Sequence, residues 1–297
     1  MIQNRRSQLF CALIVVCILA GQAAAEQGVW RAASYEGIKI AYLEAGKQNT
    51  QTLVFIHGWS CDASFWRLQI PVFSKSYQVI AVDLPGFGKS DKPHDRSYTM
   101  EFFARSLHAV IQDAQATSPV LVGHSMGYSV VRQYLITFPG TVRAVVNVDG
   151  AHLRIPKTPE MLAGFERRVN GTLSGLEGAR RKETVRQFVE STFYGKTPKP
   201  LQDKIMAVMS SADPYAAASA YRELTRLDQW KEISFDVPCL ALYALPKRLP
   251  PDHETFLRRA FPRLTYERWY DTGHYLMLEQ PKRFNDALNK FLNSLTL

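Results

Sequence analysis

The chain has 297 residues, of which 46% are apolar and 21% are charged, a composition typical of one large α/β domain with or without a modest insertion. The formal net charge is +9, but the basic residues are spread along the chain without the aromatic-interleaved patch that nucleic-acid binding requires. Histidines and cysteines also lack the spacing of metal ligands. Composition and charge therefore argue against a nucleic-acid-binding protein and a metal site. A basic surplus can favour anionic surfaces or substrates, and a generally basic surface is the simpler interpretation.

The first 25 residues have the layout of a secretory signal peptide. Arg5 and Arg6 precede an apolar run at residues 9–20, and Ala23 to Ala25 offer a small-residue cleavage site. The run is shorter than the roughly 20 residues of a membrane span. We therefore expect export, to the periplasm or the medium, and no stable membrane span after cleavage. An uncleaved anchor is the alternative, and the oligomeric state cannot be read from the sequence.

Cleavage at this position would also simplify the cysteine content. Cys11 and Cys17 would leave with the leader, and the net charge would fall from +9 to +7 because the leader carries two arginines and no acidic residue. The remaining Cys61 and Cys239 are too few for a disulfide framework. An export compartment permits a bridge between them. We expect two unpaired, mostly buried thiols instead, because one lies in a predicted loop and the other begins a predicted strand.

The mature chain is predicted to start with a hairpin at residues 30–45 and a strand at 52–56 that is apolar throughout, as in strands buried on both faces. His57, Gly58 and Trp59 follow this strand directly. Open parallel sheets bind ligands at the carboxyl ends of their strands, so we expect the loop to lie beside a substrate, with Gly58 letting the backbone approach it. His57 is interpreted as a structural, hydrogen-bonded residue.

The next predicted elements are a helix at residues 65–73, a buried strand at 77–82 and a helix at 99–116 with apolar residues along one face. DLPGFGKS, at residues 83–90, forms the loop after this strand, and its glycines and proline predict a tight, fixed turn. The glycines have neither the P-loop nor the dinucleotide-binding spacing. We therefore expect no phosphate site and no cofactor here.

An apolar run at residues 119–122 leads into GHSMG at 123–127 and then into a helical pattern. A strand, this pentapeptide and a helix together indicate a nucleophile elbow, in which the flanking glycines let the chain fold back and the serine project outward. Ser125 is the predicted nucleophile. The backbone N–H groups of Met126, at the start of the helix, and of Trp59 are the predicted donors to a developing oxyanion.

Strand and helix patterns continue to alternate after the elbow, except at residues 151–235. There the helical segments are broken by prolines, and we interpret this stretch as a helical insertion. The alternation predicts a mostly parallel central sheet covered by helices on both faces, built from residues 26–150 and 236–297. Its later elements are strands at 141–148, 237–243 and 265–270 and helices at 256–261 and 281–295.

Four motifs occur along the chain in a characteristic order, and the resemblance that they carry extends over nearly all of the mature chain. They make the chain resemble the α/β-hydrolase superfamily, in the branch of small bacterial carboxylesterases. This resemblance implies an α/β-hydrolase fold in which residues 151–235 form a helical cap over the site. The four motifs are HGW at 57–59, DLPGFGKSD at 83–91, GHSMG at 123–127 and DTGHYLMLEQPKRF at 271–284.

The resemblance also implies roles for individual residues. Ser125 would be the nucleophile and His274 the base, with Trp59 and Met126 donating through their backbone amides to the oxyanion. We expect Gly58, Trp59 and Tyr128 to contact the substrate, because their motifs place them at the site.

The triad acid departs from the family pattern. In the usual member, a glycine and then an aspartate follow the strand that corresponds to residues 237–243, whereas this chain has Ala-Leu-Pro-Lys at 244–247. Two replacements are open: Asp149, at the end of the strand after the elbow, and Asp252, in a proline-flanked loop. We favour Asp149, because a strand end holds an orienting carboxylate in place better than such a loop does. A plain turn-capping role for Asp149 is the competing interpretation.

The sequence thus predicts an exported serine hydrolase that cleaves carboxylic esters of small molecules through a Ser-His-Asp triad and an acyl-enzyme, without metal or cofactor. The same triad serves lactonases, proline aminopeptidases and other amidases, C–C hydrolases and cofactor-free haloperoxidases, and the fold does not choose among them. Epoxide hydrolases and haloalkane dehalogenases are disfavoured, because their nucleophile is an aspartate where this chain has Ser125. A non-catalytic ligand-binding protein is the alternative from another class.

Overall fold

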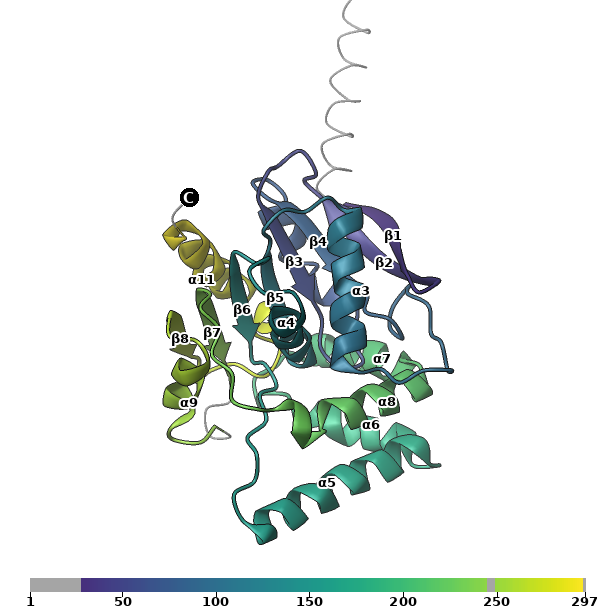
Figure 1. Cartoon of the computed structure of the whole chain (residues 1–297). Helices are drawn as coiled ribbons and strands as arrows, with labels where there is room; N and C mark the ends of the chain where they lie inside the picture. The colour runs from purple at the N-terminus through teal and green to yellow at the C-terminus, as the bar shows by residue number, and fades with distance from the viewer. Residues whose placement is uncertain (1–27, 245–248, 296–297) are drawn as a thin grey trace, which may run out of the picture.

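A computed structural model describes residues 28–244 and 249–295, so the predicted signal peptide lies outside the described residues. Eight strands form one sheet in the order β1-β2-β4-β3-β5-β6-β7-β8 (Figure 1). The first two form an antiparallel hairpin, β2 pairs antiparallel with β4, and all other pairs are parallel. The strands are β1 (Val29–Tyr35), β2 (Ile38–Ala45), β3 (Thr52–Ile56), β4 (Gln78–Val82), β5 (Val120–His124), β6 (Ala144–Val148), β7 (Cys239–Tyr243) and β8 (Leu264–Arg268).

The mostly parallel sheet predicted from the sequence is confirmed, and so is the reason for it. Every residue of β3 to β7 is buried, which requires cover on both faces and explains why these strands are largely apolar. Helices α3 (Met100–Asp113) and α4 (Met126–Thr137) lie side by side in front of the sheet in Figure 1. The tilted rings of Phe55, Trp66 and Phe284 join β3 to η1 (Ala63–Trp66) and to α11 (Pro281–Ser294).

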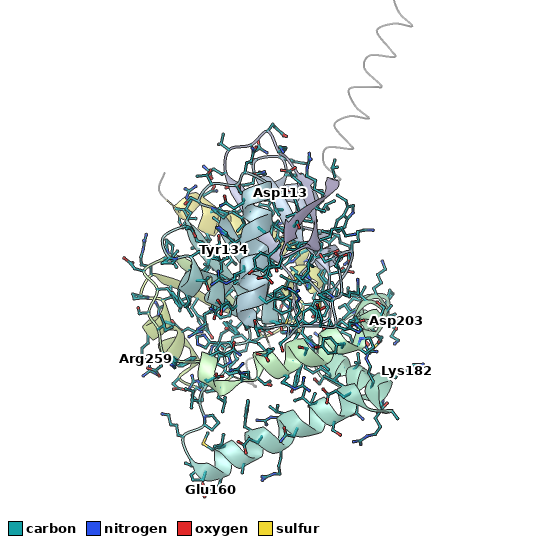
Figure 2. All side chains as sticks on the ribbon, turned by 45° about the vertical axis from the view of Figure 1, so that its right-hand side comes forward. Asp113, Tyr134, Glu160, Lys182, Asp203 and Arg259 are labelled. Atoms are coloured by element: carbon teal, nitrogen blue, oxygen red, sulfur yellow. The ribbon has the colours of Figure 1, made fainter. Side chains whose placement is uncertain are left out.

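Helices α5–α8 lie between β6 and β7 in the chain and occupy the lower part of Figure 1, beyond the sheet. Figure 2 shows Glu160 at the outer end of α5 and Lys182 at the start of α6, both pointing away from the sheet. Several prolines here start helices rather than break them, because a proline in the first turn lacks only an N–H group that has no helical acceptor. The helices are α5 (Pro159–Glu177), α6 (Arg181–Glu190), α7 (Lys199–Ser211) and α8 (Pro214–Leu224).

The helix predicted at residues 65–73 is wrong. The chain instead forms two short pieces, η1 and α2 (Ile70–Phe73). Pro71 stands in the first turn of α2, and its ring would clash with a carbonyl one turn earlier in a continuous helix. Farther along, α9 (His253–Ala260) begins three residues before the prediction, and the short α10 (Leu276–Glu279) was not predicted.

Cys61 and Cys239 are both buried and unpaired, as predicted. Burial raises the pKa of both thiols, which keeps them protonated at neutral pH. Across residues 28–244 and 249–295, no helix combines the length and the apolar character needed to cross a membrane.

Candidate active site

The turn between β5 and α4 holds Ser125 in a backbone conformation that side chains rarely adopt, with φ of +53° and ψ of −119°. Three backbone hydrogen bonds fix it there. The N–H of Ser125 donates to the Val148 carbonyl over 3.0 Å, and the Ser125 carbonyl accepts from the amides of Tyr128 and Ala151, each over 3.1 Å. Such strain is kept where the surroundings over-determine the backbone, typically at functional sites. The turn leaves Ser125 half-buried while its neighbours are fully buried.

Glycines make this turn sterically possible. A Cβ atom on Gly127 would lie 2.4 Å from the Ile56 carbonyl oxygen and 2.6 Å from that of His57. A Cβ on Gly123 would lie 2.6 Å from the backbone nitrogen of Tyr128. All of these atoms belong to the backbone, so neither position accepts a side chain without a shift of β3 or α4.

Replacing Gly127 by alanine is expected to destabilise the protein by roughly 3 kcal/mol, because the added methyl group overpacks a rigid backbone contact. Gly171→Ala is the matched control. Nothing lies within 4 Å of a Cβ at that helical position, so the gain in helix propensity should stabilise the protein by about 0.5–1 kcal/mol. Urea unfolding followed by circular dichroism measures both changes. Equal unfolding midpoints for Gly127→Ala and the parent would contradict the steric account of the turn.

Asp149 and His274 lie close together beside this turn, at the carboxyl ends of the strands. Asp149 Oδ2 lies 2.5 Å from His274 Nδ1, and Asp149 Oδ1 accepts a hydrogen bond from the Ala244 amide over 2.9 Å. The Asp149 N–H donates to the Leu242 carbonyl over 2.8 Å, which holds the backbone of this residue against the end of β7. Asp149 has a φ of +44°, a conformation that aspartate and asparagine tolerate better than most residues. Both side chains are mostly buried, at 12% and 17% exposed.

The backbone of His274 is held at both its N–H and its carbonyl group. Its backbone N–H donates to the Thr192 carbonyl of the helical insertion over 3.0 Å, while its own carbonyl lies 3.0 Å from Nε2 of His124. The two imidazole centroids are 4.6 Å apart, and His124 immediately precedes Ser125. The hydrogen bond to the carbonyl requires a proton on Nε2 of His124, and burial holds the pKa of this histidine well below its usual value. His124 is therefore a neutral support for His274.

Asp252 lies elsewhere. Its side chain is 58% exposed, and both of its oxygens lie 2.9 Å from Nη1 of Arg154. The hydrogen bond from Arg154 lowers the pKa of Asp252. Of the two aspartates singled out from the sequence, the structure brings Asp149 to His274 and leaves Asp252 in a surface ion pair.

The two predicted oxyanion donors come from the elbow itself, at Met126, and from the loop after β3, at Trp59. Met126 is the first residue of α4, so its N–H has no acceptor within the helix. For the Trp59 N–H, too, the described part of the chain supplies no hydrogen-bond acceptor. A Cβ on Gly58 would lie 3.1 Å from Ser125 Cβ, so this glycine lets the loop approach the serine closely.

The side chain of Trp59 joins this loop to the helical insertion. Its indole N–H donates to the Ala217 carbonyl of α8 over 2.8 Å, and its ring lies edge-on to Phe188 of α6 with centroids 4.9 Å apart. The neighbouring His57 is fully buried and bonded at both nitrogens. Nδ1 lies 2.8 Å from the Gly58 carbonyl, which it can contact only as a donor, and Nε2 accepts from the Leu84 amide over 3.0 Å. These bonds give His57 a structural role as a neutral imidazole.

A cavity of about 590 Å³ opens at Ser125, between the sheet and the helical insertion. This volume lies within the range of small-molecule sites, roughly 300–1,000 Å³. Trp59 and Ser125 line it, but Tyr128 does not. The Tyr128 side chain is fully buried behind the elbow, with its hydroxyl 3.4 Å from Nδ1 of His152. Apolar side chains form much of the wall, among them Phe165, Val169, Phe188, Tyr221 and Leu224.

Four basic residues of this cavity were not singled out from the sequence: His152, Arg154, Arg168 and His253. Burial lowers the pKa of His152 to about 3 and that of His253 to about 4, so both are neutral at pH 7. His152 and Arg154 could have been predicted as site residues, because they follow the end of β6 and the carboxyl ends of strands border the ligand crevice. No local pattern marks Arg168, which lies in the middle of α5.

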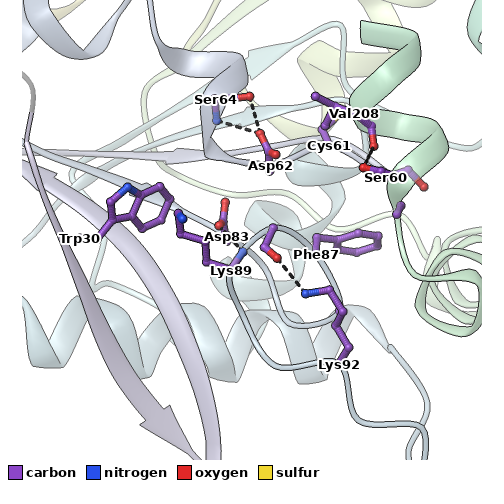
Figure 3. Close-up of a pocket in the computed structure, with 14 residues that line it drawn as sticks. Trp30, Ser60, Cys61, Asp62, Ser64, Asp83, Phe87, Lys89, Lys92 and Val208 are labelled. Atoms are coloured by element: carbon purple, nitrogen blue, oxygen red, sulfur yellow. Dashed lines mark hydrogen bonds between the residues drawn. The ribbon is translucent and has the colours of Figure 1, made fainter. Parts of the chain in front are cut away.

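A second cavity, of about 340 Å³, lies beside the loop that follows β4 (Figure 3). It shares no lining residue with the cavity at Ser125. The charged groups here mainly hold their own loops: Asp83 accepts from the amides of Ala63 and Lys89, each over 2.7 Å, and Lys92 Nζ donates to the carbonyls of Gly88 and Ser90. Among the described residues, no cluster of three or more histidine, cysteine or acidic side chains has the arrangement of a metal site.

Comparison with known proteins places this geometry in a family. Residues 51–281 match the family described as the alpha/beta hydrolase fold. The uncharacterized hydrolase YugF of Bacillus subtilis is 36% identical over 271 residues, covering 86% of this chain and 95% of that protein. A non-heme chloroperoxidase of Streptomyces lividans is 26% identical over 272 residues, covering 87% and 98%. The solved structure of an esterase from Exiguobacterium antarcticum aligns with a TM-score of 0.77 at 22% identity, covering 90% of this chain and 100% of that one.

The family match spans most of the chain, and the observed sheet order, the elbow and the helices agree with the resemblance stated from the motifs. The relatives include esterases, a chloroperoxidase and epoxide hydrolases, so the family alone leaves the substrate class open. The chain is a hydrolase that belongs to the α/β-hydrolase superfamily.

Proposed function

We propose that this protein is a serine esterase in which Ser125 is the nucleophile, His274 the general base and Asp149 the orienting acid. The observation that carries the proposal is the 2.5 Å contact between Asp149 Oδ2 and His274 Nδ1, beside a strained serine that opens into a cavity. A nucleophile, a base and a third group that orients the base form the arrangement that activates a hydroxyl at neutral pH.

The chemistry follows from these positions. Ser125 Oγ attacks the ester carbonyl carbon, and its proton passes to His274 Nε2. The Trp59 and Met126 amides hold the oxyanion, and the carbonyl re-forms as the alcohol leaves with that proton. Water then attacks the acyl-enzyme, giving its proton to Nε2, and Ser125 regains a proton as the carboxylic acid leaves. Throughout, the Asp149 carboxylate stays ionised and accepts a hydrogen bond from the Nδ1–H of His274, which leaves Nε2 to exchange the proton with the serine.

Esters are preferred over the other bonds that this triad can cleave because esterases are among the most similar solved structures. Chloroperoxidase activity, named for one relative, is the second candidate, since cofactor-free haloperoxidases carry the same triad. The leader-like residues 1–25 support export as part of the proposal.

Hydrolysis of a series of p-nitrophenyl esters, from acetate to palmitate, tests the bond type. We expect kcat/KM to rise by up to about fourfold for each additional CH₂ that becomes buried, from about 0.8 kcal/mol per CH₂, and to fall once the acyl chain exceeds the cavity. Absence of turnover across the whole series in a folded protein would contradict an esterase and would redirect the search to amides, lactones and C–C bonds.

A further inference from the structure

The charges at the wall of the Ser125 cavity are all of one sign. Arg154 and Arg168 line it, and its lining residues, all from the described part of the chain, include no aspartate or glutamate. The two histidines of the wall are neutral at pH 7 for the reasons given above. A largely apolar small-molecule site that carries only cationic groups is suited to a ligand with an anionic end.

The guanidinium group of Arg154 has a hydrogen-bond partner at one of its terminal nitrogens and none at the other. Its Nη1 binds both oxygens of Asp252, and its guanidinium carbon lies 4.4 Å from the centre of the Phe256 ring, which fixes the plane of the group. Its Nη2 is buried and has no hydrogen-bond acceptor within residues 28–244 and 249–295. Buried donors without an acceptor are costly, so this nitrogen is placed to donate to a group that the protein itself does not supply.

Arg168 belongs to α5, on the face of that helix that lines the cavity. Phe165, Arg168 and Val169 all line it, and the spacing of three and four residues places them on one helix face. Arg167 is also exposed but lies off this face and does not line the cavity. Among the described residues, Arg168 has no ion-pair partner.

We propose that the substrate is an ester bearing a carboxylate remote from the scissile bond, with its apolar body in the cavity and its carboxylate held between Arg154 Nη2 and Arg168. The inference rests on the proposed esterase function and adds the substrate class. Asp252 neutralises Arg154, so one net positive charge remains at the wall, which matches a monoanionic carboxylate better than a dianionic phosphate. Guanidinium groups also pair with carboxylates in a directional, planar geometry.

Two 4-nitrophenyl esters that differ only in this charge test the proposal. The mono-4-nitrophenyl ester of hexanedioic acid carries a terminal carboxylate, and the corresponding ester of its monoamide carries a terminal amide of nearly equal size. The full-length protein is expected to hydrolyse the carboxylate ester with a kcat/KM about tenfold higher than the amide ester, since hydrogen bonds between charged groups are stronger than neutral ones. Equal kcat/KM values would overturn the anionic subsite while leaving the esterase in place.

Variants locate the subsite. Arg168→Gln is expected to remove most of the tenfold preference for the carboxylate ester over the amide ester, and Arg167→Gln, on the same helix, is expected to leave this preference intact. Arg154→Lys keeps a positive charge that can pair with Asp252 but removes the second nitrogen, which corresponds to Nη2. This variant is therefore expected to reduce the preference for the carboxylate ester without removing it. A preference that survives Arg168→Gln, or one lost equally in Arg167→Gln, would contradict the assignment.

Binding separates this proposal from the proposed function. Isothermal titration of the protein with hexanedioate and with its diamide needs no catalysis. If neither ester turns over but hexanedioate binds in an Arg168-dependent way, the esterase proposal fails and the carboxylate subsite stands. If esters turn over but the dianion and the diamide bind equally, the subsite fails alone. A 4-nitrophenyl 5-phosphonopentanoate, in which phosphorus takes the place of the carboxylate carbon, would overturn the choice of carboxylate if it were hydrolysed faster than the carboxylate ester.

Discussion

Ser125→Ala is expected to abolish ester hydrolysis, lowering kcat by roughly 10⁴-fold or more while the protein stays folded. The magnitude follows from removing the only atom that forms the acyl-enzyme, since loss of a triad nucleophile leaves only the catalysis supplied by oxyanion donors and binding. The fold is expected to tolerate the change because Ser125 is held through its backbone N–H and carbonyl. Alanine retains both groups.

The measurement is turnover of the best p-nitrophenyl ester, with circular dichroism and urea unfolding as checks of the fold. Ser106→Ala is the matched control, because Ser106 is also a serine in the core, lies in α3 and does not line the cavity. We expect this control to keep its turnover within about twofold, as for a site outside the catalytic unit. Comparable activity in Ser125→Ala and the parent would refute the nucleophile assignment and, with it, the acyl-enzyme mechanism.

The core of the fold was predictable because its signals are local. Strands such as β3 and β5 are mostly apolar because both of their faces are covered, and five consecutive residues are enough to show this pattern. The helix predicted at residues 65–73 is wrong because the prediction gave more weight to the apolar spacing than to Pro71. Proline has no N–H to donate to the preceding helical turn, and its ring would clash with a carbonyl there. The break in this helix was therefore also predictable from a local residue, Pro71.

The site was harder to predict because it depends on contacts between distant segments. Motifs identified Ser125 and His274 as candidates, and the choice between Asp149 and Asp252 rested on which backbone is rigid. The burial of Tyr128 behind the elbow was not visible in its motif. Arg168 joins the cavity through the packing of the helical insertion, and a single cation on an amphipathic helix carries no signal for that.

The acid is the assignment that mutation tests most sharply, because the two candidate aspartates lie in unlike surroundings. Asp149→Asn is expected to lower kcat by roughly 10³- to 10⁴-fold. An amide can present an NH₂ group to His274 Nδ1, which favours the tautomer with its proton on Nε2 and removes the base from the serine. Asparagine also tolerates the positive φ of this position, so the loss is expected without unfolding.

Asp252→Asn is the matched comparison, with the same chemical change in a carboxylate that is 58% exposed and paired with Arg154. Exposed ion pairs contribute about 0–1 kcal/mol, and this one does not contact His274. We therefore expect turnover of a neutral ester such as p-nitrophenyl butyrate to stay within about threefold of the parent, which corresponds to less than about 1 kcal/mol. The test uses a neutral ester because the pair adjoins the proposed carboxylate subsite. A large loss in Asp252→Asn together with a small one in Asp149→Asn would reverse the assignment, and it would mean that His274 leaves Asp149 during catalysis.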